Sequence, residues 1–319
     1  MEQFRVSVIV PTRNRPDQIG PCVESILANN HPSMELIVVD QSDARDSESA
    51  LVAFRQDPRF RYVVTSTRGA ARARNVGIEA STADLIAFTD DDCRVPTDWV
   101  ARIAELFDNE PTAGVIFGRV DIPKNALEGG FLSSFEPVRR SYEGEFPSGL
   151  EPWGIGANMA VRRKVVEDIG AFDPLLGPGS KFKAGEDVDF AIRAIARRWK
   201  VVTANEIPLL HLGVRTGESA RALLLGYMFA TGAVFTKHLR LRTPGSVKLF
   251  AGFLGLQLGT VANSLLRGTR PTGIRQFLTL LSGAGQSVSH AIDRNQQVYV
   301  TGSSGASSSG RAVQVVKSK

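Results

Sequence analysis

The stretch DLIAFTDDDCRV, residues 84–95, joins an apolar run directly to three adjacent carboxylates, Asp90, Asp91 and Asp92. The apolar residues predict a buried strand over 84–89. Adjacent carboxylates repel one another, so at a strand end they require a bound cation or basic partners. Oxygen ligands favour hard ions such as Mg²⁺ and Mn²⁺, which often bind together with substrate phosphates. Because α/β sheets bind ligands at the carboxyl ends of their strands, the stretch predicts a metal and diphosphate site; the alternative is a solvated acidic loop.

The residues around this stretch alternate short apolar runs with segments of helical period. Further strands are expected over 6–11, 35–39, 61–64 and 114–122. Helices are expected over 16–27, around 50–54, over 69–80 and over 99–107. Strands that alternate with crossover helices predict an α/β fold, with a mostly parallel sheet flanked by helices.

The pattern changes after residue 122, where the loops become longer. Residues 125–153 are rich in Gly, Pro and Glu, and we expect them to be mobile or to depend on a partner. The regular elements expected beyond them are a strand over 156–161, helices over 163–169 and 186–197, and a short extended segment over 201–203.

The charge is distributed unevenly along the 319 residues. Residues 1–218 contain 26 basic and 32 acidic side chains, whereas residues 219–292 contain 8 basic side chains and no acidic one. The basic stretch is interleaved with long apolar runs, which argues against nucleic-acid binding. The two cysteines, Cys22 and Cys93, lie far apart in sequence, and no secretory signal is evident before Val6; we therefore expect a reducing, cytoplasmic location.

The basic region is expected to form three apolar helices, separated by breaks at 240–244 and 267–273. The middle piece, Leu249–Leu266, has 18 residues without a charge, which is the lower limit of a membrane-spanning length. Its polar residues and glycines, together with the basic flanks, favour a helix that lies on an anionic membrane. The alternative is a helical subdomain that packs on the rest of the chain or on a second copy.

Other strand ends supply further candidate binding residues. Asp40 follows the second predicted strand, where it could accept a hydrogen bond from a nucleobase or ribose, or could instead cap a helix with Ser42 and Asp43. Residues 11–14, Pro-Thr-Arg-Asn, end the first strand, and Arg72, Arg74 and Asn75 follow Gly69. Basic groups at these positions suit a nucleotide phosphate.

Five segments together resemble the family 2 glycosyltransferases, which have the GT-A fold. These segments are VSVIVPTRNR, LIVVDQSD, RGAARARNVG with the following LIAFTDDD, GANMAVRR and GEDVDFAIRA. They occur in the family's usual order between Val6 and His211. The resemblance implies transfer of a sugar from a nucleotide-diphosphate sugar to an acceptor hydroxyl, with inversion at the anomeric carbon.

The resemblance also implies a role for each matching residue. Those expected to bind the nucleotide sugar are Pro11, Thr12, Arg13, Asp40, Arg74, Asp90 and Asp91. Asp92 would ligate Mg²⁺ or Mn²⁺, with His211 as a further ligand or as a structural histidine. Asp187 would be the general base, with Glu186 as the lesser candidate; without the resemblance, both would be read as residues that complement a helix dipole. Trp153, Gly156, Ala157 and Asn158 would line the acceptor side.

On this basis the chain is expected to have three parts. They are a catalytic domain over 1–218, a basic apolar helical region over 219–295 and a flexible tail over 296–319. The catalytic domain would divide into a nucleotide-sugar part, 1–122, and an acceptor part, 123–218. The acceptor would be a lipid-linked or cell-surface glycan precursor at the cytoplasmic face of the membrane.

Two other functions remain open at this point. A sugar-phosphate nucleotidyltransferase would share the sheet and the acidic site, but PTRNRPDQIG lacks the expected glycine-rich, Lys-containing loop. An aspartyl phosphatase would need a DxDx[T/V] pattern, and Arg94 occupies its last position. A non-catalytic GT-A-like scaffold is the other alternative, although a binding module has no need for a base at Asp187.

Overall fold

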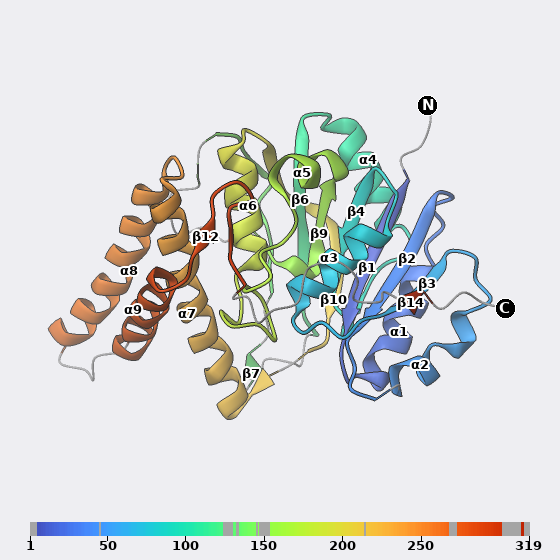
Figure 1. The fold of residues 1–319 in the computed structure, drawn as a ribbon, viewed down its shortest axis with the longest axis horizontal. Helices are drawn as coiled ribbons and strands as arrows, with labels where there is room; N and C mark the ends of the chain where they lie inside the picture. The colour runs from blue at the N-terminus through green and yellow to red at the C-terminus, as the bar shows by residue number, and fades with distance from the viewer. Residues whose placement is uncertain are drawn as a thin grey trace.

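The structure, a computed structural model, describes residues 5–44, 46–123, 130–131, 134–144, 146, 154–213, 215–267, 273–301 and 314–315. One mixed sheet forms its centre (Figure 1). Its strand order is β14 (Gln314–Val315), β3 (Phe60–Val64), β2 (Met34–Asp40), β1 (Val6–Thr12), β4 (Leu85–Phe88), β9 (Met159–Arg162), β6 (Ala113–Asp121), β10 (Lys200–His211) and β5 (Cys93–Arg94), and β8 (Arg140–Tyr142) pairs with β10. The pairs among β3, β2, β1 and β4 are parallel, as expected, and β9 runs antiparallel to β4 and β6.

The central strands bring three predicted sites to one edge of the sheet. Thr12 at the end of β1 pairs with Asp40 at the end of β2, and Ile9 pairs with Phe88 at the end of β4. The apolar residues of β1, β2 and β4 are almost fully buried, because helices cover both faces. The acidic triplet therefore follows a buried strand, as the sequence predicts.

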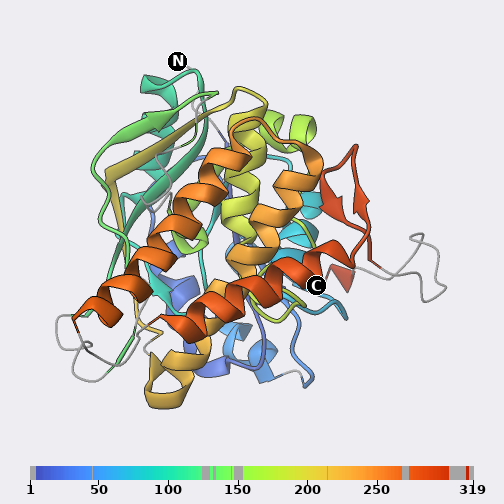
Figure 2. The same cartoon turned by 90° about the vertical axis from the view of Figure 1, so that its left-hand side faces the viewer.

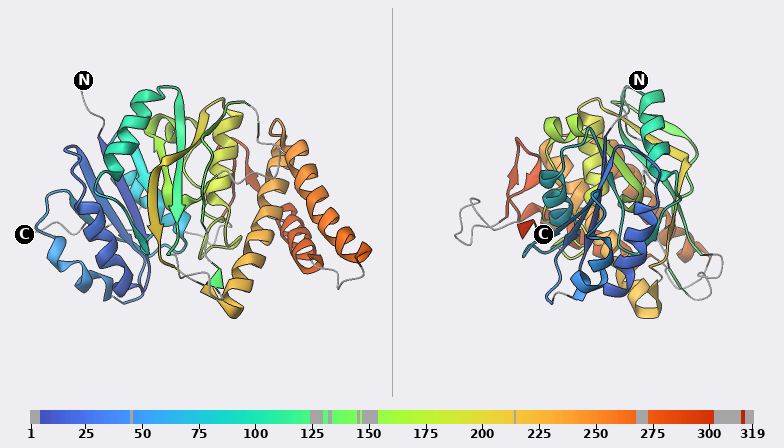
Figure 3. Two further views of the ribbon diagram at one scale, coloured as in Figure 1. Left: turned by 180° about the vertical axis from the view of Figure 1, so that it is seen from behind. Right: turned by 90° about the vertical axis from the view of Figure 1, so that its right-hand side faces the viewer.

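The flanking helices agree with the sequence prediction, with one break. They are α1 (Pro16–Leu27), α3 (Ala70–Ala80), α4 (Trp99–Asn109), α5 (Arg163–Ile169) and α6 (Glu186–Ala196). Figure 3 shows α1 and α4 on one side of the sheet and α3 and α5 on the other. The helix expected around 50–54 is divided into α2 (Asp46–Ala50) and a 3₁₀ turn, η1 (Val52–Phe54).

Two predictions on the acceptor side need correction. The strand expected over 156–161 begins with a 3₁₀ turn, η2 (Gly156–Asn158), and becomes extended only at Met159. The segment expected over 201–203 is part of the much longer β10, which pairs with β6 on both sides of an irregularity between Ala204 and Pro208. The polar residues 205 and 206 interrupt the apolar pattern there, so the sequence showed only the first part of the strand.

The C-terminal region forms the three expected helices, α7 (Gly217–Leu241), α8 (Ser246–Leu266) and α9 (Ile274–Val288). They lie at the end of the molecule opposite β3 and α2 (Figures 1 and 2). α7 and α9 touch closely: a Cβ on Gly232 would lie 2.0 Å from the carbonyl oxygen of Leu280. By length and composition α7 and α8 could each cross a membrane, but 44% of the apolar stretch of α7 is buried within the protein, against 11% for α8.

A network of fully buried charges fixes α7 to the rest of the protein. Lys237 of α7 donates to Asp173 (2.8 Å) and forms an ion pair with Asp189 of α6. Arg193 and His238 also contact Asp189, each at 3.0 Å. These side chains have almost no solvent exposure, so the C-terminal half of α7 is part of the protein core, whereas its first turns are exposed or partly exposed.

The first part of the expected flexible tail is folded. β12 (Ile292–Asp293) and β13 (Val298–Tyr299) form a hairpin. Tyr299 is buried; its amide donates to Asp173 and its hydroxyl to the carbonyl of Ala233. The prediction that the tail begins at residue 296 is therefore wrong, because the sequence did not reveal that a single aromatic side chain would anchor this segment. Of the Ser/Gly-rich stretch 301–310, all but Thr301 lies outside the described residues.

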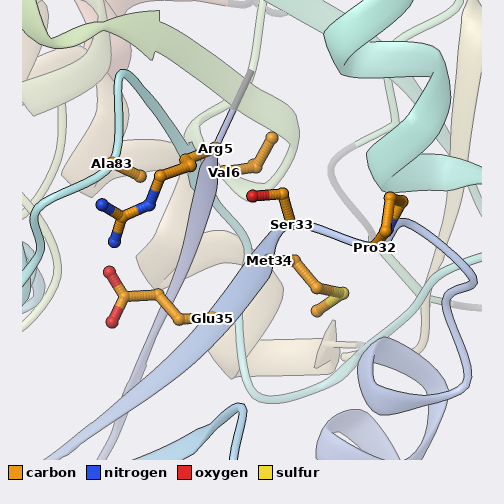
Figure 4. Close-up of a pocket in the computed structure, with 7 residues that line it drawn as sticks. All are labelled: Arg5, Val6, Pro32, Ser33, Met34, Glu35 and Ala83. Carbon is orange, nitrogen blue, oxygen red and sulfur yellow. The ribbon is translucent and has the colours of Figure 1, made fainter. Parts of the chain in front are cut away.

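The structure has a pocket at the amino-terminal edge of the sheet (Figure 4). It has a volume of about 230 Å³, and Arg5, Ser33 and Glu35 are among the residues that line it. A larger hollow of about 690 Å³ lies between residues 167–174 and residues 293–301. Neither is lined by the acidic triplet or by the predicted base.

Candidate active site

The loop after β1 meets the acidic triplet directly. Thr12 donates its hydroxyl to Asp91 at 2.8 Å. One guanidinium nitrogen of Arg15 donates to both Asp91 (2.8 Å) and Asp92 (2.9 Å). Burial and the neighbouring Asp92 raise the pKa of Asp91 to about 6, against the opposing effect of Arg15. The repulsion within the triplet is thus reduced by a basic partner from this chain.

One carboxylate oxygen of Asp92 is placed where it could act as a ligand to a cation. Its Oδ2 binds Arg15, whereas its Oδ1 is buried and has no hydrogen bond among the described residues. That Oδ1 lies 3.2 Å from Nε2 of His211, which reaches the site from the end of β10. Burial opposes ionisation of Asp92, but His211 and Arg15 outweigh it and lower the pKa of this carboxyl. A carboxylate oxygen beside an imidazole nitrogen is a donor set suited to a divalent ion.

Two neighbours complete this corner of the site. Cys93 places its sulfur with the Asp92 and His211 ligand atoms, all within 4.8 Å of one another, and burial raises the pKa of its thiol. Gly213 leaves the space open: a Cβ there would lie 2.3 Å from Oδ2 of Asp92 and 3.2 Å from Nε2 of His211. Any larger residue at 213 would therefore displace the Asp92 carboxylate.

Arg74 of α3 connects the triplet to the predicted base region. Its guanidinium donates to Asp90 (2.8 Å) and to Glu186 (2.6 Å), and only 2% of the residue is exposed. Burial disfavours its charge, but Asp90, Glu186 and Asp187 outweigh that effect and raise the pKa. Neighbouring carboxylates bind both terminal nitrogens of Arg74, and its contact with a base or phosphate stays a prediction.

Glu186 and Asp187 begin α6, where Gly185 supplies the left-handed backbone (φ 85°) that the entry to the helix requires. Asp187 accepts hydrogen bonds from the amides of Gly156 and Val188, both at 2.8 Å. Asp187 is partly exposed, whereas Glu186 is buried against Arg74. Burial, followed by the charge of Asp187, raises the pKa of Glu186 to about 7, and burial also raises the pKa of Asp187.

The other predicted nucleotide residues lie at the same sheet edge but do not form one cluster. Asp40 is buried and accepts hydrogen bonds from the hydroxyl of Tyr62 (2.6 Å) and the amide of Ser42 (2.8 Å). Arg13 is largely exposed and pairs with Asp43 at 3.1 Å. Pro11 is partly buried within β1. The contact with Ser42 is a local turn ahead of α2, whereas the alternative role expected from the sequence was a helix cap with Ser42 and Asp43.

The predicted acceptor side is only partly supported. Gly156 lies beside Asp187, and all three of Gly156, Ala157 and Asn158 are buried. Asn158 donates to the carbonyls of Arg119 and Ile207 and accepts from Trp99, so it bridges the irregularity between β6 and β10. Ala157 and Asn158 therefore do not line an open acceptor surface. Trp153 lies outside the described residues.

Two residues at the site were missed by reading the sequence. Arg15 stands in the same PTRNR segment as Arg13, and the pattern does not tell which arginine turns toward the triplet. Gly213 gave no signal beyond being a glycine close to His211. Both are significant only because β10 and the loop after β1 meet at Asp92 in space.

Comparison with known proteins gives a consistent family. The model described as Glycosyl transferase family 2 matches residues 7–170. The glucosyl-dolichyl phosphate glucuronosyltransferase of Haloferax volcanii is 25% identical over 224 residues, which cover 64% of this chain and 67% of that protein. The succinoglycan biosynthesis protein ExoO of Rhizobium meliloti is 35% identical over 246 residues, which cover 74% of this chain and 68% of that protein. Three Rickettsia glycosyltransferases are much longer, and the match spans 26% or 29% of their length.

A solved structure shows the same fold. It is that of the mannosyltransferase PcManGT from Pyrobaculum calidifontis in complex with GDP-Man and Mn²⁺. The TM-score is 0.59 at 18% sequence identity, and the alignment covers 90% of this chain and 88% of that chain. At this level of identity the likeness concerns the fold alone.

Proposed function

Because the chain belongs to the family 2 glycosyltransferases and has the GT-A fold, we propose that it transfers a sugar, with inversion, from a nucleoside-diphosphate donor to an acceptor hydroxyl. The observation that carries this proposal is the pairing of two features at one sheet edge. One is the buried Oδ1 of Asp92, which lies 3.2 Å from Nε2 of His211. The other is the partly exposed Asp187, which is connected to the triplet through Glu186, Arg74 and Asp90.

Asp92 and His211 are the residues that would hold the metal. Mg²⁺ and Mn²⁺ both accept a carboxylate oxygen, and the mannosyltransferase with the similar fold was solved with Mn²⁺. When bound, such an ion neutralises charge that develops on the departing diphosphate. The chain contributes a buried carboxylate that Arg15 holds on one oxygen and leaves available on the other.

Asp187 is the residue that would take the proton from the incoming hydroxyl. The amides of Gly156 and Val188 fix the orientation of its carboxylate, and burial raises its pKa toward the range useful for a base. Glu186 is less suited because Arg74 binds its carboxylate in the interior. Glu186 would instead set the electrostatic environment of Asp187.

The test is a donor screen with UDP-, dTDP- and GDP-sugars, with Mg²⁺, Mn²⁺ or EDTA present. Release of nucleoside diphosphate supports the proposal, whereas release of pyrophosphate would indicate a nucleotidyltransferase. Asp92→Asn and Asp187→Asn should each reduce transfer by at least about 100-fold, a usual effect of losing a catalytic group. Asp98→Asn is a matched control, because this exposed residue pairs only with Arg102 among the described residues. Retained anomeric configuration in the product would refute the role of Asp187.

We also propose that α8 and α9 place the enzyme on an anionic membrane at its cytoplasmic face. Large apolar residues are exposed along both helices: Val247, Leu256, Leu258, Leu265, Leu266, Ile274, Leu278, Leu281 and Val288. Exposed basic residues flank them: Lys248, Arg267 and Arg275. An apolar face with basic flanks suits an anionic lipid surface. A lipid-linked or cell-surface glycan acceptor would agree with this location and with the two curated relatives, named for dolichyl phosphate and succinoglycan.

Vesicle sedimentation tests this second proposal. The protein should sediment with vesicles that contain anionic lipid, and a variant with glutamate at Leu256, Leu258 and Leu265 should remain in solution. Val52→Glu is the control, since Val52 is 55% exposed and belongs to η1, which directly follows α2. Equal sedimentation of the triple variant and the wild type would exclude α8 as the membrane contact.

A further inference from the structure

Arg15 has a position that neither the motifs nor the proposed roles explain. We propose that Arg15 is the resident counter-cation of Asp91 and Asp92 in the donor-free enzyme, and that its guanidinium moves to the donor diphosphate when metal and donor bind. This inference rests on the proposed function, because it requires a diphosphate at the acidic triplet.

The contact geometry is that of a cation held between two anions. A single nitrogen of Arg15 lies 2.8 Å from Asp91 and 2.9 Å from Asp92. The Arg15 side chain is 34% exposed, whereas those of Asp91 and Asp92 are 6% and 9% exposed. The guanidinium therefore approaches from the solvent side of the triplet and can leave without unpacking the core.

The backbone of Arg15 is fixed while its side chain is not. Its carbonyl accepts hydrogen bonds from the amides of Gln18 and Ile19 at the start of α1, and Pro16 follows it. The described structure gives the Arg15 side chain only the two carboxylates as hydrogen-bond partners. A side chain on an anchored backbone can change partners at little cost to the fold.

The charges around Arg15 favour such an exchange. Asp90 is paired with Arg74, so Arg15 faces the two carboxylates of Asp91 and Asp92, and Asp92 also contacts His211. A divalent ion on Oδ1 of Asp92 would neutralise the two carboxylates and so remove the net attraction that holds the guanidinium. A diphosphate adds negative charge, and its oxygens match the fork of donors that arginine presents.

Arg13 illustrates the difference within the same loop. It is 44% exposed and pairs with Asp43, which Arg68 also contacts. No contact between Arg13 and the triplet is present in the described structure. The neutralising role belongs to Arg15 and is not a general property of basic residues in this segment.

Binding measurements on the full chain separate this role from a structural one. The variants are Arg15→Met, which removes the charge, and Arg15→Lys, which keeps it; Arg102→Met is the control, since Arg102 pairs with Asp98 on its own helix. Titration calorimetry would measure MnCl₂ alone, and UDP and pyrophosphate each in saturating MnCl₂. These probes need neither the donor sugar nor turnover.

Arg15→Met should bind Mn²⁺ about fivefold more tightly, because a competing positive charge is lost. The same variant should bind UDP and pyrophosphate about tenfold more weakly in saturating MnCl₂, because a charge-assisted hydrogen bond is lost. Arg15→Lys should recover part of both changes, and Arg102→Met should show neither. A general loss of structure would not strengthen Mn²⁺ binding while it weakens diphosphate binding. If Arg15→Met folds poorly, Arg15→Lys can still be measured.

Two results would overturn the inference. Weaker Mn²⁺ binding by Arg15→Met would mean that Arg15 merely orients Asp92, and unchanged UDP and pyrophosphate binding would mean that it does not reach the diphosphate. If the wild type binds neither Mn²⁺ nor UDP, the proposed function itself fails, and this inference with it. If the wild type binds both and Arg15→Met changes neither, only the role of Arg15 is refuted.

Discussion

Replacing Lys237 by methionine should lower the free energy of unfolding by about 3 kcal/mol, at the lower end of the range for breaking a buried ion pair. Lys237 is fully buried, and its ammonium contacts Asp173, Asp189 and the carbonyl of Gln297. Methionine is of similar length but carries no charge. The substitution would therefore leave a buried cluster with one uncompensated negative charge.

The magnitude follows from the contacts that remain. Asp173 keeps hydrogen bonds from the amides of Leu175 and Tyr299, and Asp189 keeps Arg193 and His238. These contacts are why the expected loss lies near the lower end of the range. In the wild type, burial of Asp189 is outweighed by Lys237 and Arg193, which lower the pKa of this carboxyl; in the variant, Arg193 and His238 remain as the contacts that stabilise its charge.

Equilibrium urea unfolding, followed by tryptophan fluorescence, would measure the effect, since Trp99 lies in the buried core of the catalytic part. Lys248→Met is the matched control: Lys248 is exposed on α8, so its loss should change stability by no more than about 0.5 kcal/mol. The double variant Lys237→Met/Asp189→Asn should be more stable than the sum of the single losses predicts, by at least about 1 kcal/mol. A loss below about 1 kcal/mol for Lys237→Met, or strict additivity, would refute the argument that this network holds α7 in place.

Three further outcomes follow from the site and its surroundings. kcat/KM should fall below about pH 7, as the interacting carboxylates of Glu186 and Asp187 take up a proton. Glu186→Gln should move this acidic limb of the pH profile to lower pH. An acidic limb that does not move would contradict an interaction between the two carboxylates. Gly213→Ala should weaken Mn²⁺ binding at least about tenfold, because the added methyl group would displace the Asp92 carboxylate. Gly255→Ala is the control, since a Cβ at Gly255 has no neighbour within 4 Å. Equal Mn²⁺ affinities of Gly213→Ala and the wild type, measured by calorimetry, would show that the loop adapts. Burial lowers the pKa of His238, so below about pH 6.5 the unfolded chain binds more protons than the folded protein, and stability should fall as the pH falls. Between about pH 7.5 and 5.5 the urea midpoint of His238→Gln should change less than that of the wild type. An identical change in both proteins would exclude His238 as the cause.

The site was predictable from the sequence where chemistry lies at the end of a buried strand. The runs before Thr12, Asp40 and Asp90 are apolar enough to define strands, and parallel strands bring their carboxyl ends to one edge. The sequence therefore indicated the acidic cluster. It could not indicate the partner of each side chain, because Arg13 and Arg15 differ only in the direction that the loop gives them.

The sequence alone determined the order of the main strands and helices, the family, and the uneven distribution of charge between the catalytic part and the C-terminal helices. Those features depend on local periodicity and on motifs, which are properties of neighbouring residues. Only the tertiary structure showed that buried ion pairs hold α7 in the core and that Tyr299 anchors the segment after α9. It also showed that Asn158 connects two strands and does not face an acceptor. Each depends on contacts between residues far apart in the chain. A charge or an amide can be buried only where the fold supplies a partner for it.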